Sequence, residues 1–264
     1  MLTEDLVNLV VQHKKEIEHD YNEASFLYPF WQNSPPDDRG RAPRGDQTPW
    51  IEVGEHAIGS KLSRMLAKDY LIKDSGLPTG ADQRFVLTSP KLGIATGGYT
   101  DSAWLFVDIK SVGPRDDQDH TVMSHNQVSG DGIWEEEEAG VENTPMIARG
   151  ARASHPFHCS VPPLFVLSTG EVAPTVILAL KPVYKMLPNE RTAKNSGQPI
   201  ERIDIACIPN GLLLTCNPKY LEKYPSLLFP GKDDKGKDPR KVRARVGFEP
   251  LRQIDQWRHQ KIPF

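Results

Sequence analysis

The sequence predicts a loop-rich protein of the α/β or α+β class. Its 264 residues are 38% hydrophobic and 25% charged, which is ordinary for a globular protein with a substantial core. Short apolar runs typical of buried strands occur beside amphipathic segments typical of helices. The 23 prolines and 20 glycines indicate many turns between these elements. We expect one domain over residues 1–264, with an N-terminal helix in residues 1–20 and a functional body in residues 21–250.

Composition and charge restrict the classes of protein. No apolar run approaches 18 residues and no signal-peptide pattern is present, so we expect no membrane partner. The net charge of −3 gives no overall attraction to nucleic acid, and any such contact must come from local clusters. The three cysteines are odd in number and widely spaced, which indicates a reducing, cytoplasmic location without a disulfide framework.

A short apolar run over residues 104–110 carries the most informative polar residues. It reads WLFVDIK, and its brevity and its aromatic and β-branched content predict a buried strand. Side chains alternate between the faces of a strand, so Asp108 and Lys110 share one face and Ile109 lies on the other. Burying an acid and a lysine is costly unless something there requires them. A divalent metal and a phosphodiester would require both.

A second acid lies upstream of this strand. Residues 77–82 form an expected turn that ends at Asp82, and residues 84–89 form an expected strand that leaves it. If the two strands pair antiparallel, Asp82 lies beside Asp108. Two neighbouring carboxylates repel each other unless a cation lies between them, and oxygen ligands of this kind select Mg²⁺ or a similar hard ion. The residues alone leave a buried salt bridge as the alternative.

Two amphipathic helices are expected in the first quarter of the chain. The first has apolar side chains three or four residues apart, at Leu6, Val10, His13, Ile17 and Tyr21. The second covers residues 50–67 and carries Glu52 and Glu55 near its start. Acids in a first turn usually interact with the helix dipole, and a role as outer metal ligands is the alternative.

Between these helices lies a Pro/Gly loop, residues 35–46, with three arginines at positions 39, 41 and 44. Its charges nearly cancel, so the loop taken alone favours a solvated loop, and phosphate contacts by its arginines are the alternative. Downstream, residues 163–167, 174–180 and 203–208 are further strand candidates. Asn210-Gly211 predicts a hairpin between residues 203–208 and 212–216. A zinc site at His155, His158 and Cys159 is disfavoured, because no second pair stands at a suitable spacing.

Residues 232–245 form a local basic segment. They include seven basic and three acidic residues in a chain that is net negative. From Lys241 onward basic and apolar residues alternate, so a strand here would show Lys241, Arg243 and Arg245 on one face. The residues alone favour an edge strand that its charges protect from further pairing.

Several of these segments, in the same order and at nearly the same spacing, resemble BglI-type type II restriction endonucleases of the PD-(D/E)xK nuclease superfamily. The resemblance runs from about residue 21 to about residue 246. Besides the turn at Asp82, it rests on PRGDQ at 43–47, WIEVGE at 50–55, VDIKSVGPRD at 107–116, NQVSG at 126–130, IPNG at 208–211 and PGKDD at 230–234. It implies a mixed, largely antiparallel central sheet flanked by helices. It also implies a homodimer that uses Mg²⁺ to hydrolyse double-stranded DNA at an interrupted palindrome with GCC/GGC half-sites.

The resemblance also assigns roles to individual residues. Asp82 and Asp108 would be metal carboxylates, the Ile109 carbonyl a further metal ligand, and Lys110 the catalytic lysine. The residues that would contact DNA bases are Lys232, Asp234, Arg243 and Arg245. Their chemistry agrees, because arginine and lysine donate to guanine O6 and N7 and aspartate accepts from cytosine N4.

Two features depart from the family pattern. Ala81 stands where the superfamily motif has a proline before the first acid, but a proline there does no chemistry. The acidic residues at 135–138 and 142 would repel DNA, so we expect them in solvent. Two alternatives remain open: a DNA-binding protein without catalysis, in which Asp82, Asp108 and Lys110 form a buried ion cluster, and a structure-specific nuclease on the same core.

Overall fold

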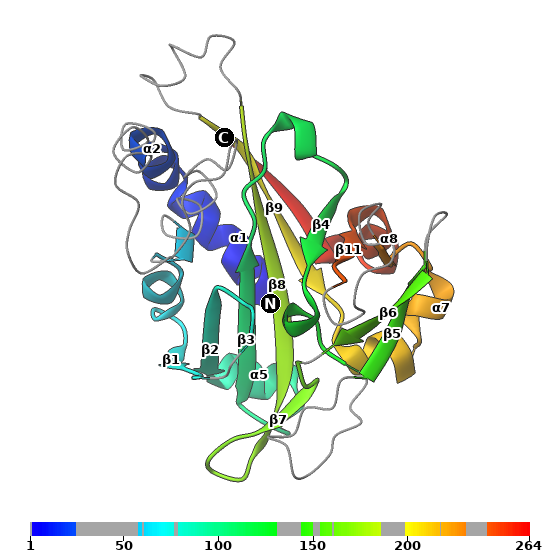
Figure 1. Cartoon of the computed structure of the whole chain (residues 1–264). Coiled ribbons are helices and arrows are strands. Elements are labelled where there is room, and N and C mark those ends of the chain that lie inside the picture. Colours follow the sequence, from blue (N-terminus) through cyan, green and yellow to red (C-terminus); the bar gives the residue numbers. More distant parts are fainter. Residues whose placement is uncertain are drawn as a thin grey trace, which may run out of the picture.

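The computed structural model shows two sheets and a separate hairpin, with helices around them (Figure 1). The residues that it describes are 2–24, 58–59, 61–76, 79–130, 144–149, 154–159, 161–185, 199–216, 218–230 and 242–264.

The central sheet is mixed and largely antiparallel, as the resemblance implied. Its strands in spatial order are β1 (Leu71–Asp74), β2 (Gln83–Thr88), β3 (Ser102–Ile109), β8 (Val172–Tyr184), β9 (Ile200–Ile208) and β12 (His259–Pro263), and β7 (Leu164–Val166) also pairs with β8. Among the described strands of this sheet, β3 and β8 pair in parallel and the other pairs are antiparallel. The strands expected over residues 84–89, 104–110, 163–167, 174–180 and 203–208 are all present, some with longer or slightly shifted bounds.

A three-stranded antiparallel sheet covers one side of the central sheet. Its order is β10 (Leu228–Pro230), β11 (Ala244–Gly247) and β4 (His120–Met123). The described end of the basic segment, Ala244 and Arg245, therefore lies in the middle strand, and the interpretation of that part as an edge strand, made from the residues alone, is wrong. The sequence could not indicate a middle strand, because β4, one of the two strands that pair with β11, lies far away in the sequence. A separate hairpin joins β5 (Thr144–Arg149) to β6 (Ser154–Cys159).

The expected N-terminal helix is two helices, α1 (Leu2–Gln12) and α2 (Lys14–Ala24). They meet at His13, and the four apolar side chains predicted to face the body are buried, namely Leu6, Val10, Ile17 and Tyr21. Of the second expected helix, residues 58–59 and 61–66 are helical, while Glu52 and Glu55 lie outside the described residues. The other α-helices are α5 (Pro90–Ala95), α7 (Tyr220–Lys223) and α8 (Phe248–Ile254), and the short 3₁₀ turns are η3 (Pro114–Asp116), η4 (His125–Gln127) and η7 (Gln256–Arg258).

β3 separates two hydrophobic clusters. Leu105, Val107 and Ile109 pack in a cluster with α1 and α2, whereas Trp104 and Phe106 pack with the three-stranded sheet and α8. Alternation along the strand therefore places Asp108 on the side of the three-stranded sheet. Each face of β3 is covered, which explains why the whole strand is buried.

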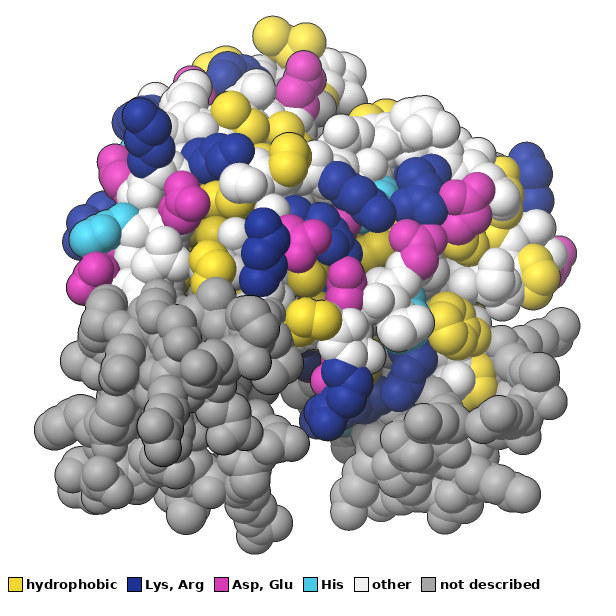
Figure 2. Space-filling model, turned by 90° about the horizontal axis from the view of Figure 1, so that it is seen from above, with side chains coloured by type: hydrophobic (Ala, Val, Ile, Leu, Met, Phe, Trp, Pro, Cys, Tyr) yellow, Lys and Arg dark blue, Asp and Glu magenta, His cyan; other side chains and the backbone are white. Residues whose placement is uncertain are grey.

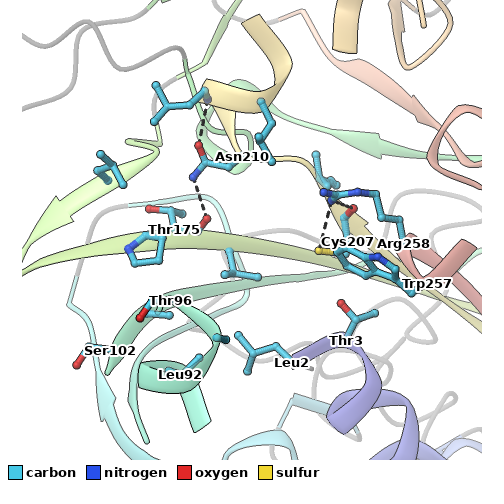
Figure 3. A pocket seen from close by; sticks show the side chains of 18 residues that line it. Leu2, Thr3, Leu92, Thr96, Ser102, Thr175, Cys207, Asn210, Trp257 and Arg258 are labelled. Atoms are coloured by element: carbon cyan, nitrogen blue, oxygen red, sulfur yellow. Dashed lines mark hydrogen bonds between the residues drawn. The ribbon is translucent and has the colours of Figure 1, made fainter. Parts of the chain in front are cut away.

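The predicted hairpin at Asn210-Gly211 is wrong, because Leu212–Cys216 forms a π-helical turn, η5. The Asn210 side chain accepts from the Leu212 amide (3.0 Å) and donates to the Thr175 carbonyl (3.1 Å; Figure 3). A Cβ on Gly211 would lie 1.3 Å from the Gly130 carbonyl oxygen. The dipeptide serves tertiary packing between loops here, and that packing overrides its local preference for a hairpin turn.

No helix in the described part of the chain is long and apolar enough to cross a membrane.

Candidate active site

Asp82 and Asp108 lie opposite each other where β2 begins and β3 ends. The two strands are antiparallel, as expected, and the pairing of Gln83 with Val107 places the preceding Asp82 across from Asp108. Asp82 Oδ2 also accepts a hydrogen bond from the Ile109 amide (2.6 Å). The structure thus brings together two acids from different strands.

Asp108 is a buried carboxylate with one unused oxygen. Its side chain is only 4% exposed, and its Oδ2 accepts no hydrogen bond from the described residues. Burial raises the pKa of Asp108 to about 7. The positive charges of Lys110 and Arg243 oppose this rise, and the negative charge of Asp82 adds to it. Burial likewise raises the pKa of Asp82, against the Ile109 amide and Lys110.

Lys110 follows the last residue of β3 and completes the cluster. Its amide donates to the Leu180 carbonyl of β8 (2.8 Å), which extends the parallel pairing past the end of the strand. Its side chain is half-buried, and its charge acts on both Asp82 and Asp108. Ile109, between the two polar residues, has its side chain in the core, so the expected alternation of faces is confirmed.

Gln127 belongs to this site, and the sequence analysis missed it. Its Nε2 donates to Asp108 Oδ1 and to the Gly80 carbonyl (2.8 Å), and its Oε1 accepts from the Ser124 amide (2.7 Å). The pattern S-x-x-Q at 124–127 is a capping box and would have predicted the local turn. Nothing in that pattern indicates that the second amide hydrogen reaches Asp108.

The turn that carries Asp82 packs tightly against the turn that carries Gln127. The Gly80 amide donates to the Asn126 carbonyl (2.9 Å), and a Cβ on Gly80 would lie 2.3 Å from Asn126 Oδ1. A larger residue at this position would have to displace the Asn126 side chain, because all three nearest atoms belong to it.

The donor set of this site fits a hard divalent cation. Asp82 and Asp108 supply carboxylate oxygens, one of them buried without a partner among the described residues. Within the described part of the chain, no third acidic, histidine or cysteine side chain completes a metal cluster with them. A cation held here would therefore take its other oxygens from main-chain carbonyls, water or a substrate, as Mg²⁺ commonly does.

Two of the four expected base-contacting residues lie in the described structure. Arg243 is exposed immediately before β11, and its charge reaches Asp108. Arg245 lies within β11 on the face opposite the buried Ala244 and Val246. Lys232 and Asp234 lie outside the described residues, as do the arginines at 39, 41 and 44 and the acidic run at 135–138. Figure 2 shows basic side chains mixed with acidic ones over much of the face seen from above.

A separate apolar pocket of about 450 Å³ lies at the other end of β3 (Figure 3). Ser102 and Ala103, at the start of the strand, contribute to its lining, whereas Asp108 lies near the end of the strand. No carboxylate is among the described residues that line it. Its chemistry does not match that of the acidic site.

Comparisons with known proteins identify the family. A family model for the restriction endonuclease BglI matches residues 1–262. The type II restriction enzyme BglI of Bacillus subtilis is 48% identical over 255 residues, covering 95% of this chain and 85% of that protein. The chain belongs to the BglI family of restriction endonucleases.

Solved structures agree with this assignment. The crystal structure of BglI bound to its DNA recognition sequence matches with a TM-score of 0.86 and 46% identity, covering 99% of this chain and 88% of that one. The tetrameric restriction endonuclease SfiI, in a complex with cognate DNA, matches with a TM-score of 0.66 at 14% identity, covering 100% and 82%. The likeness to SfiI shows the fold alone.

Membership of the BglI family makes this protein a type II restriction endonuclease, a DNA-binding hydrolase that uses a divalent metal. In this BglI-family protein, Asp82, Asp108 and Lys110 converge where β2 begins and β3 ends.

Proposed function

We propose that this protein hydrolyses both strands of DNA with Mg²⁺ held by Asp82, Asp108 and the Ile109 carbonyl. The observation that carries the proposal is the buried Oδ2 of Asp108, which has no hydrogen-bond partner among the described residues and lies opposite Asp82 on the neighbouring strand. Carboxylate and carbonyl oxygens are the ligands that Mg²⁺ prefers, and the ion would accept phosphate oxygens as further ligands.

The side chains divide the chemistry among them. A bound Mg²⁺ supplies Lewis acidity at the scissile phosphate. Lys110 orients the attacking water and offsets negative charge on the phosphate. Gln127 fixes the Asp108 carboxylate by its bond to Oδ1, so that Oδ2 is the oxygen directed to the ion.

The proposed substrate is an interrupted palindrome with GCC/GGC half-sites, bound by a homodimer in the cytoplasm. Lys232, Asp234, Arg243 and Arg245 would read the bases, because this set offers the donors and acceptor that G·C pairs require in the major groove. Arg243 supports this proposal, since it is exposed yet near enough for its charge to act on Asp108.

Digestion of plasmid DNA tests the function. Purified protein with Mg²⁺ should give discrete fragments whose sequenced ends lie between GCC and GGC half-sites, and excess chelator should abolish cutting. A smear, or cleavage confined to branched DNA, would replace the proposal by a non-specific or structure-specific nuclease. Mn²⁺ should also support cutting, whereas Ca²⁺ should support binding with little turnover, because its longer and looser coordination positions the reacting groups poorly.

A further inference from the structure

A closed ring of polar side chains holds residues 117–119, the segment that leads into β4. In Figure 1 the chain rises from the end of β3, passes through η3 near the top and descends through this segment into β4. The side chains of the ring come from this segment, β9, β12 and α8. In order around it, the members of this charged ring are Asp117, Arg202, Asp204, His259, Arg252 and Asp119.

The first half of the charged ring runs along β9. Arg202 Nη2 donates to Asp117 Oδ1, and Arg202 Nε donates to Asp204 Oδ2 (3.0 Å). The other oxygen of Asp204 lies 3.1 Å from His259 Nε2. Asp204 and His259 are both almost completely buried. The contacts of its two oxygens, one with Arg202 and one with His259, therefore hold the Asp204 carboxylate in one orientation.

The second half closes through α8. Arg252 Nη1 lies 2.9 Å from His259 Nδ1, and an arginine can only donate, so Nδ1 accepts and Nε2 donates to Asp204. Arg252 then makes two bonds to Asp119, at 2.8 and 3.3 Å. A fork of this kind fixes orientation as well as distance.

Lys181 of β8 enters the charged ring from the core, with only 1% of its surface exposed. Its ammonium lies 3.1 Å from Asp117 Oδ1 and donates to the Gln118 carbonyl. It also lies 5.3 Å from the centre of the Phe248 ring, which stacks on His259 at 4.2 Å. A buried ion pair contributes little net stability compared with apolar packing, but it holds its two partners in one geometry.

The residues on either side of Lys181 in β8 bind the backbone of the segment that follows β3. The amides of Lys110 and Val112 donate to the carbonyls of Leu180 (2.8 Å) and Pro182 (2.9 Å), on either side of Lys181. The same short stretch of β8 therefore fixes Lys110 through its backbone and residues 117–119 through a side chain.

On the side of Asp119, the charged ring is attached to the three-stranded sheet. The Phe248 amide donates to the Asp119 carbonyl (3.1 Å), and His120 of β4 pairs with Gly247 of β11. The start of β4 and the end of β11 are thus attached together to the central sheet. Arg245 lies two residues before Gly247 on the same strand.

We propose that the charged ring and Lys181 are a positioning device that sets the three-stranded sheet, with Arg243 and Arg245, at a fixed place relative to Asp108 and Lys110. This inference rests on the proposed function. DNA bound by the three-stranded sheet would then present its scissile phosphate to Lys110 only while the charged ring is closed. Breaking the contacts of the charged ring should slow the cleavage of bound DNA more than it weakens DNA binding.

The experiment measures two quantities for Lys181→Met and Arg252→Gln. One is the affinity for cognate DNA in Ca²⁺, and the other is the single-turnover cleavage rate in Mg²⁺ with enzyme in saturating excess, well below the unfolding temperature. We expect the cleavage rate to fall tenfold or more while the dissociation constant changes by less than threefold. The double variant should lose little more than the worse single variant, because both changes release the same segment, residues 117–119. If Lys181→Met does not fold, Arg252→Gln, on the more exposed side, carries the test.

Ile203→Val is the matched control, since it lies between Arg202 and Asp204 and loosens the core without removing a member of the charged ring. Its cleavage rate per bound DNA should equal that of the wild type. An unchanged rate in both ring variants, or a loss of affinity as large as the loss of rate, would overturn the inference. A wild-type protein that cuts no DNA would instead overturn the proposed function.

Discussion

At the scale of single residues, the fold holds Asp108 where its negative charge is poorly compensated. Its Oδ1 receives one amide hydrogen from Gln127, and its Oδ2 receives none from the described residues. Lys110 and Arg243 favour the charged form, but burial outweighs both and raises the pKa of Asp108 to about 7. The metal-free protein therefore stores an unfavourable charge that a divalent cation would relieve.

Asp108→Asn should stabilise the metal-free protein at high pH. Because the folded pKa lies above the unfolded value, the native state keeps a proton that the unfolded chain loses between about pH 4 and 7, and stability falls across that window. Asp108→Asn removes the ionisable group, so this fall in stability does not occur in the variant. Urea unfolding with chelator should show little difference near pH 4 and a gain of about 4 kcal/mol at pH 8. A difference in stability between variant and wild type that is equal at pH 4 and pH 8 would contradict the raised pKa of Asp108.

Gln127→Ala should weaken both the fold and the site. It leaves Asp108 Oδ1, the Gly80 carbonyl and the Ser124 amide without their partner. Unpaired buried groups of this kind cost about 1–3 kcal/mol each, so unfolding in urea should show a loss of at least about 2 kcal/mol. Gln260→Ala, which removes a single exposed bond to the Gln256 carbonyl, is the control and should have no measurable effect.

At the scale of elements, β11 and the residue before it carry two of the side chains proposed to contact bases, Arg243 and Arg245. Its apolar residues are buried, while Arg243 is exposed and Arg245 half-buried. Alternation within the sequence predicted which side chains would share a face. It could not predict that β4 pairs on one side of β11 and β10 on the other, because such pairings are decided by tertiary packing between distant segments.

Arg243→Ala should cost roughly 1–3 kcal/mol of binding to cognate DNA and much less with unrelated DNA. The physical reason is the loss of a bidentate contact to a base, which unrelated sequences do not offer. Binding to both duplexes should be measured in Ca²⁺ at two salt concentrations. Arg44→Ala is the comparison, expected to weaken all sequences alike and to lessen the salt dependence. An equal loss on both duplexes for Arg243→Ala would assign that side chain to phosphate.

Gly211→Ala should be strongly destabilising, by more than about 2 kcal/mol. The new Cβ would collide with the Gly130 carbonyl oxygen, a main-chain atom that cannot rotate away. Gly93→Ala offers a control in α5, where the nearest contact of a Cβ is an ordinary 3.6 Å to Asp101. That change should be neutral or stabilising by about 0.5–1 kcal/mol. Similar unfolding temperatures for Gly211→Ala and Gly93→Ala would contradict the close contact between Gly211 and Gly130.

At the scale of the whole molecule, the sequence predicted the parts better than their connections. The strand that ends at Asp108, the strand that begins after Asp82 and the buried face of the first helices follow from local periodicity. The parallel contact of β3 with β8, the role of Gln127 and the charged ring depend on side chains that meet only after folding. Asn210-Gly211 shows the same limit, since its strong hairpin preference yields to contacts with Thr175 and Gly130.

The most direct measurement of the central claim combines DNA cleavage with calorimetric Mg²⁺ titration for three variants. Asp82→Ala and Asp108→Ala should lose both cutting and metal binding, because each removes a carboxylate ligand. Lys110→Ala should lose cutting while largely keeping the metal, because the lysine acts on water and phosphate. All three should remain folded and bind cognate DNA. Robust cleavage by any of them, or unchanged metal affinity in both aspartate variants, would contradict the assignment of the active site to the ends of β2 and β3.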